Sequence, residues 1–218
     1  MRRATSGCVY AAPVPSPSPA PVRASGASPG RPSAGAQRVL DAALDLFSEH
    51  GFEGTSLQDI ADRLGVTKAA VYYHFHTKGE LLQALVRPAF DDLLALVAEG
   101  GRRPAGGRSR GVEVAAYVDF LLRHRRLSVY LTRDATAMSR AVVLEQATEV
   151  RERTEEMLFG AGDDGLSAIW GAATLQALAG ALVAAPADVS DEWLREELTE
   201  LGAHLLAGYR RAVRRREA

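Results

Sequence analysis

Apolar residues recur at spacings of three and four along most of this 218-residue chain, and no segment alternates apolar and polar positions as a half-buried strand does. The ranges with a helical pattern are 33–50, 57–64, 68–74, 78–99, 112–126, 128–136, 138–159, 164–185 and 190–214. The chain is therefore predicted to be all-α, with about nine helices. Its apolar content of 47% is enough to bury a core in one or two domains.

Two short helices joined by a tight turn are predicted in residues 55–78, which read TSLQDIADRLGVTKAAVYYHFHTK. Thr55 and Gln58 have the spacing of a capping box, and Gly65 can adopt the left-handed conformation that ends a helix. Thr67 can then cap the second helix. Two helices joined by a turn of a few residues that includes glycine form a helix-turn-helix, whose second helix enters the major groove of DNA.

The remaining segments suggest three regions. Residues 1–32 are rich in Pro, Ser, Ala and Gly, which predicts a disordered arm. The arm holds four arginines and no acid, so it is either a solvated tail or a basic arm that touches DNA. The helix at 78–99 is expected to break or bend at Pro88, and 100–111 to form a flexible loop. We expect a DNA-binding domain at 33–80 and a helical regulatory and dimerisation domain at 81–218.

Charge and cysteine content bear on DNA binding and on the cellular compartment. The net charge of −1 gives the chain no general attraction to DNA, but residues 67–79 contain two lysines, two histidines and no acid. Cys8 is the only cysteine and no secretory signal is evident, which favours a cytoplasmic protein. Residues 165–187 carry no charge, but their alanine and glycine content favours a buried, closely packed helix over a membrane span.

The sequence has no phosphate-binding G-x-x-x-x-G-K loop and no metal-binding H-E-x-x-H motif, so we expect neither an enzyme nor a cofactor. His74 and His76 lie two residues apart and would not face each other on a helix, and no cluster of Cys or acidic residues stands near them. We therefore expect no metal site.

Residues 37–85 closely resemble the DNA-binding domain of TetR-family transcriptional regulators. Three features carry the resemblance: a first helix ending in LFSEHGF, the turn DIADRLGV, and VYYHFHTKGELL. The family implies a homodimeric, ligand-responsive regulator, usually a repressor. It also implies contacts with an operator in double-stranded DNA at residues that we group by role: Thr67 and Lys68 at the start of the recognition helix, the small residues Ala69 and Ala70, the aromatic residues Tyr72 and Tyr73, and the phosphate contacts Thr55, His74 and Lys78.

Tyrosine suits such a role because its ring can meet thymine methyl groups and its hydroxyl can donate a hydrogen bond, whereas lysine acts as a point charge for phosphate. Tyr72 has an alternative interpretation as a partly buried residue, because it follows the core residue Val71.

The later helices are expected to mount a dimer and hold a small-molecule effector. Leu194, Leu198, Leu201 and Leu205 form an apolar stripe, and the uncharged helix before them offers small residues for close packing. Seven residues of the middle helices are candidates to line an effector cavity, although each is also a plausible core residue: Tyr117, Phe120, His124, Tyr130, Met138, Met157 and Trp170. Such a cavity would suit a small, largely apolar ligand.

Two functions fit these observations. The first is a homodimeric repressor released from an inverted-repeat operator by a small molecule. The alternative is a ligand-independent DNA-binding activator or architectural protein.

Overall fold

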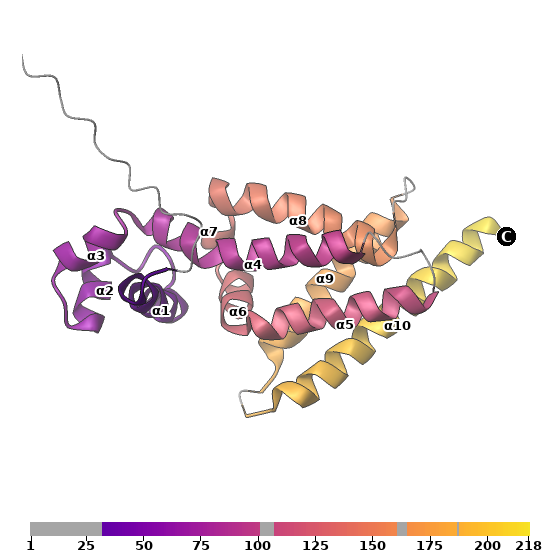
Figure 1. Ribbon diagram of the computed structural model, residues 1–218. Coiled ribbons are helices and arrows are strands. Elements are labelled where there is room, and N and C mark those ends of the chain that lie inside the picture. Colours follow the sequence, from indigo (N-terminus) through magenta and orange to yellow (C-terminus); the bar gives the residue numbers. More distant parts are fainter. Residues whose placement is uncertain (1–31, 101–106, 161–164, 187) are drawn as a thin grey trace, which may run out of the picture. The chain divides into compact units, whose positions relative to one another are not determined.

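The computed structural model describes residues 32–100, 107–160, 165–186 and 188–218. These residues form ten α-helices and no strand, so the predicted all-α class is confirmed (Figure 1). In chain order the helices are α1 (Ala34–His50), α2 (Leu57–Leu64), α3 (Lys68–His74), α4 (Lys78–Gly100), α5 (Gly107–Arg123), α6 (Arg125–Arg133), α7 (Ala135–Met138), α8 (Ala141–Phe159), α9 (Leu166–Ala184) and α10 (Asp191–Glu217). Except for Pro32, the predicted N-terminal arm lies outside the described residues.

Helices α1, α2 and α3 pack on one another, and their ends follow local capping rules. The capping box of α2 begins one residue later than predicted. Ser56 Oγ accepts the Asp59 N–H at 3.2 Å, and the Asp59 carboxylate accepts the Ser56 N–H at 2.7 Å. Gly65 ends α2 in the left-handed conformation, as expected.

Thr55 is buried and does not cap α2. Its hydroxyl lies 3.2 Å from the Leu46 carbonyl and 3.0 Å from the Gly51 carbonyl, to which it donates. It therefore fastens the start of α2 to the end of α1. Its neighbour Ser56 is exposed and so is free to turn its hydroxyl to the helix end.

Helix α4 runs without a break from Lys78 to Gly100, so the expected break at Pro88 is wrong, while a bend there stays a prediction. Pro88 lies on the exposed side of the helix. Proline has no N–H to donate to the carbonyl four residues earlier. On the exposed side of the helix, water can hydrogen-bond to that carbonyl instead, so the helix continues. The predicted domain boundary near residue 80 falls inside this helix.

Two other boundaries differ from the sequence pattern. Helix α5 starts at Gly107, so the part of the expected loop from 107 to 111 is helical, while residues 101–106 lie outside the described residues. Asp134 separates α6 from the short α7. The hydrophobic pattern alone does not distinguish α7 as a helix of its own. The Asp134 carboxylate accepts the Ala137 N–H at 3.0 Å, and this cap starts a new helix.

Helix α9 is the uncharged helix, and only one side of it is buried. Leu178 and Leu182 face the core, whereas Ile169 is 67% exposed. The exposed positions recur at helical spacing: Ala168, Ile169, Ala172, Ala173, Gln176 and Gly180. Among the described helices, α9 alone is long and apolar enough to cross a membrane by length and composition. Within the single chain, the predicted burial of this helix is therefore only partial.

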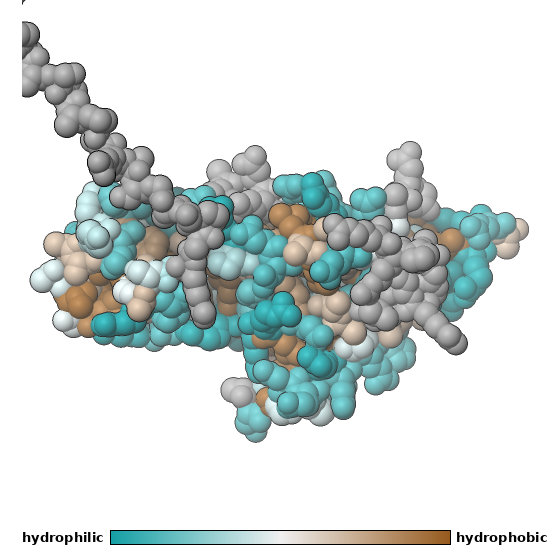
Figure 2. All heavy atoms as spheres, viewed as in Figure 1, coloured by the Kyte–Doolittle hydropathy of each residue, from teal (hydrophilic) through white to brown (hydrophobic). Residues whose placement is uncertain are grey.

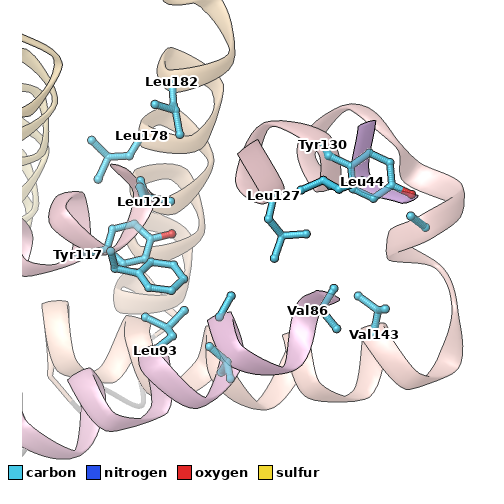
Figure 3. Packing of buried hydrophobic residues seen from close by; sticks show 14 of the residues in the cluster. Leu44, Val86, Leu93, Tyr117, Leu121, Leu127, Tyr130, Val143, Leu178 and Leu182 are labelled. Atoms are coloured by element: carbon cyan, nitrogen blue, oxygen red, sulfur yellow. The ribbon is translucent and has the colours of Figure 1, made fainter. Parts of the chain in front are cut away.

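One core links the helices. Phe47 of α1 stacks on Tyr130 of α6 with ring centroids 5.9 Å apart. Further along, α4 contacts α5 and α8, while α10 packs against α5 and α9. Figure 3 shows buried side chains of α4, α5, α6, α8 and α9 converging in this core.

Candidate nucleic-acid interface

Helix α3 is short and is anchored by a single fully buried side chain, Val71. Thr67 caps it, with Oγ1 accepting the Ala70 N–H at 3.3 Å. Lys68, Ala69 and Ala70 are all exposed on its first turn. The helix therefore presents a small-residue surface next to a lysine. In Figure 2, apolar patches interrupt a mainly hydrophilic surface, one of them at the end of the molecule that carries α2 and α3.

Both tyrosines of α3 point to solvent. Tyr72 is 51% exposed and its ring stacks on His76 with centroids 4.7 Å apart. Tyr73 is 81% exposed, and its ring meets His74 edge-on at 5.1 Å. Large exposed aromatic residues are uncommon on a surface without a partner. The structure thus disagrees with the alternative that Tyr72 belongs to the core.

His74 is half-buried between α3 and the start of α1. A Cβ built at Gly35 would lie only 2.9 Å from His74 Nε2, so glycine is the residue that allows this close approach. Arg38 follows Gly35 by about one turn of α1 and is exposed. Arg38 was not selected from the sequence. Its place one helical turn after Gly35 was the available signal, but that signal is recognisable only once Gly35 is known to pack against α3.

Lys78 is occupied inside the fold. Its Nζ donates to the Phe52 carbonyl at 2.7 Å and the Glu53 carbonyl at 3.3 Å, and it lies 4.7 Å from the centre of the Phe52 ring. By contrast, no carboxylate pairs with Lys68 among the described residues. Lys68 is thus the more available cation, while Lys78 holds the turn between α1 and α2.

Three of the seven candidate effector residues meet at one cavity: Tyr117, Phe120 and Met138. Its volume is about 370 Å³, and its walls come from α4, α5, α6, α7 and α9. Sequence reasoning missed the α4 wall, which includes Phe90 and Leu93.

The other four candidates lie elsewhere. His124 Nε2 is 2.9 Å from an Asp92 carboxylate oxygen, and Tyr130 borders a second cavity on the opposite side of α6. Met157 fills the space beside Gly100, and Trp170 the space beside Gly208. These four side chains pack between helices or pair with a neighbour, as aromatic and methionine residues at helical spacing commonly do.

Asp134 connects the cavity wall with the DNA-binding helices. Its carboxylate accepts the Phe52 N–H at 2.8 Å, in addition to capping α7. Burial raises the pKa of Asp134, but the hydrogen bonds from Phe52 and Ala137 outweigh it and leave the pKa below its usual value. Ion pairs from Arg126 to Asp45 and from Arg140 to Glu53 lie at the same junction.

Comparisons with known proteins show what the helix-turn-helix and the whole fold are similar to. Residues 39–85 match the family model described as bacterial regulatory proteins, tetR family. The chain is 43% identical over 56 residues to the biofilm operon icaADBC HTH-type negative transcriptional regulator IcaR of Staphylococcus aureus, a match that covers 26% of this chain and 30% of IcaR. It is 28% identical over 163 residues to the HTH-type transcriptional activator FasR of Mycolicibacterium smegmatis, a match that covers 73% of this chain and 72% of FasR.

Solved structures share the fold. The TetR-family regulator PfmR of Thermus thermophilus is 24% identical with a TM-score of 0.59, covering 77% of this chain and 97% of PfmR. A TetR-family regulator from Bordetella parapertussis is 16% identical with a TM-score of 0.65, covering 78% of this chain and 95% of that one. The predicted resemblance is confirmed, and the chain carries the helix-turn-helix and the all-helical fold of these regulators.

Proposed function

We propose that this TetR-family transcriptional regulator is a homodimeric repressor that binds an inverted-repeat operator and is released by a small molecule. The observation that carries the DNA-binding part is the exposed face of α3, where Tyr72, Tyr73 and Lys68 stand on a helix anchored by Val71. Such a face suits the major groove, because tyrosine can read base edges and lysine can contact phosphate.

The residues of this face divide by role. Ala69 and Ala70 are small enough to let the α3 backbone approach the bases, and Tyr73 extends furthest into solvent. Lys68 and Arg38 would contact phosphates on either side of the groove. The buried Thr55 hydroxyl and the engaged Lys78 ammonium are assigned to holding the helices in place.

The dimer is proposed to form through the exposed face of α9. Leu194 and Leu198 of α10 are buried within the chain, whereas Leu201 and Leu205 are only partly buried, so half of the stripe predicted from sequence is already covered by the chain itself. The α9 face is apolar and lined by small residues, and no described side chain lies within 4 Å of a Cβ built at Gly180. A second copy would cover this face around a two-fold axis, which would also present two recognition helices to two half-sites.

Release is proposed to act through α4 and the α6–α7 junction. Helix α4 begins at Lys78, which touches the α1–α2 turn, and its later residues line the cavity. A ligand in the cavity can release DNA only if it binds the released state better than the DNA-bound state. A coupling of about 1–3 kcal/mol corresponds to a loss of operator affinity of roughly 5–150-fold.

Footprinting on DNA fragments selected by the purified protein tests the operator. We expect a protected region with inverted symmetry. Protection without that symmetry, or a single protected half-site at saturation, would contradict the dimeric mode.

The oligomeric state can be tested separately. Ala172→Glu places a charge on the exposed α9 face and should yield a monomer by light scattering, whereas Ala95→Glu, at an exposed alanine of α4, should leave the dimer intact. An unchanged mass for Ala172→Glu would overturn the α9 interface.

A second candidate function is transcriptional activation, favoured by the likeness to the activator FasR across most of both chains. Transcription in vitro from a promoter that carries the selected operator distinguishes the two. A repressor lowers transcript yield when added, and an activator raises it.

A further inference from the structure

The cavity between α4, α5, α6, α7 and α9 has a lining without charge. None of the fifteen described residues that line it is Asp, Glu, Lys, Arg or His. Figure 3 shows Tyr117, Leu93 and Leu121 on one side of this region and Val86 and Leu127 on the other. Transferring a charged group to such surroundings without a partner costs several kcal/mol. A ligand that fills the cavity must therefore be neutral where it is buried.

The charged side chains nearest in sequence to the lining are turned to other partners. Arg133 is next to the lining residue Thr132 and donates to the Val183 carbonyl at 3.4 Å. Asp134 is held by Phe52 and Ala137, and the Asp92 carboxylate by His124. The exposed lining residues Thr132, Ala135 and Gln176 are uncharged as well. Arg87 and Arg126, which follow or precede lining residues of α4 and α6, are paired with Asp91 and Asp45. Among the described residues, the lining thus offers an anionic group of a ligand no cation.

Tyr117 supplies a buried polar group. It is 7% exposed, and its ring stacks on Phe120 with centroids 6.0 Å apart. No hydrogen bond to its hydroxyl is formed by any of the described residues, and burial alone raises the pKa of Tyr117. Because no described residue accepts from it, the hydroxyl can donate to a ligand oxygen placed beside it in the cavity.

We propose that the effector is a neutral, largely apolar molecule that carries one hydrogen-bond acceptor for the Tyr117 hydroxyl. Its role as effector rests on the proposed function, but its binding does not. Carboxylates, phosphates and nucleotide-linked ligands are disfavoured by the same lining. A body of fused or linked rings suits a cavity of about 370 Å³ that is walled by Tyr117, Phe120 and Phe90.

Two fluorescent probes with the same ring body isolate charge. N-phenyl-1-naphthylamine is neutral, and 1-anilinonaphthalene-8-sulfonate adds a single sulfonate. We expect the neutral probe to bind at least about tenfold more tightly. Ala179→Leu, which fills the cavity, should abolish this binding while circular dichroism and thermal melting report an intact fold. Equal affinity for both probes, or neutral-probe binding that survives Ala179→Leu in a folded protein, would overturn the proposal.

A charge swap sharpens the test. Thr132→Lys places a cation at the rim and should raise affinity for the sulfonate while leaving the neutral probe within about twofold. Thr148→Lys is the matched control, because Thr148 is also an exposed helical threonine whose hydroxyl donates to the carbonyl four residues earlier, at 2.8 Å in both cases. An equal gain in the two variants would show that the sulfonate binds elsewhere and would contradict the proposal.

The acceptor is tested with 6-propionyl-2-dimethylaminonaphthalene, a neutral probe whose emission shifts when its carbonyl accepts a hydrogen bond. Tyr117→Phe should weaken its binding and shift its emission to the blue, whereas the control Tyr209→Phe should do neither, since Tyr209 donates to the Phe159 carbonyl elsewhere. Unchanged emission in Tyr117→Phe would remove the hydroxyl from the site. Operator affinity of the same ligand-free variants is measured in parallel, so a protein that binds the probes but no DNA counts against the proposed function alone.

Discussion

Two pairs of aromatic residues in this chain have opposite surroundings. Tyr72 and Tyr73 of α3 stand in solvent beside histidines, whereas Tyr117 and Phe120 of α5 are buried and stack on each other at the wall of a cavity. The first pair rests on one buried valine and contributes little to the core. The second pair is part of the core and also borders empty space. The same side-chain type can thus serve an external partner where it is exposed, and an internal ligand where the core is incompletely filled.

Among substitutions at these two aromatic pairs, the largest expected effect is on stability. Tyr117→Ala should lower the free energy of unfolding by about 3 kcal/mol, because it deletes a buried ring. Urea unfolding followed by circular dichroism measures this. The operator affinity of the folded fraction should stay close to that of the unsubstituted protein. A loss of operator affinity as large as that of an α3 variant would contradict the separate roles of the two aromatic pairs.

Tyr73→Ala should show the reverse pattern. Binding to the selected operator should weaken by about 1–3 kcal/mol if the ring meets base edges, while stability should stay within about 0.5 kcal/mol. Binding isotherms with operator and unrelated duplex check the difference. Equal losses on both duplexes would assign Tyr73 to phosphate contacts.

Asp134→Asn tests the junction between the two regions. Asparagine has a single side-chain acceptor oxygen, so one of the two hydrogen bonds is lost, at about 1.5 kcal/mol near neutral pH. The folded-state pKa of Asp134 is below its unfolded value, so its stabilisation is complete above about pH 4 and is lost as the pH falls through the folded pKa. The stability difference between the two proteins, measured by urea titration at several pH values, should therefore shrink in acid. A difference that stays constant to low pH would refute this role of the carboxylate.

Two lysines provide the smallest effect. Lys68→Ala should weaken binding to operator and unrelated duplex about equally and reduce the salt slope of log K by about 0.9, as expected for one lost phosphate contact. Lys78→Ala should chiefly lower stability, because Lys78 holds the Phe52 and Glu53 carbonyls. The sequence suggests instead that Lys78 contacts phosphate. That assignment would be correct if Lys78→Ala changed the salt slope as Lys68→Ala does and left stability unchanged.

The DNA-binding helices were the most predictable part of the molecule from sequence. Their signals are local: Ser33, Gly51, Gly65 and Thr67 determine helix ends through nearby backbone atoms, and Val71 has no alternative to burial. The errors were also local ambiguities, since Thr55 and Ser56 are both hydroxyl residues and only tertiary contacts decide which one caps α2.

The cavity was less predictable because it depends on how helices distant in sequence pack. Tyr117 and Trp170 have equivalent signatures in the sequence, yet Tyr117 lines empty space and Trp170 fills the space beside Gly208. The sequence predicted that α9 offers small residues for close packing, but not which face the chain leaves exposed, because an uncharged helix suggests burial without saying whether this chain or another covers it.

The hydrogen bond from Phe52 to Asp134 gives the molecule a built-in reporter. The Phe52 amide proton belongs to the turn that precedes the DNA-binding pair of helices, yet its acceptor belongs to the junction beside the cavity. Its rate of exchange with deuterium therefore measures how often the two parts separate, without any probe attached to either. If ligand binding releases DNA as proposed, the exchange of this single amide should change when a ligand fills the cavity.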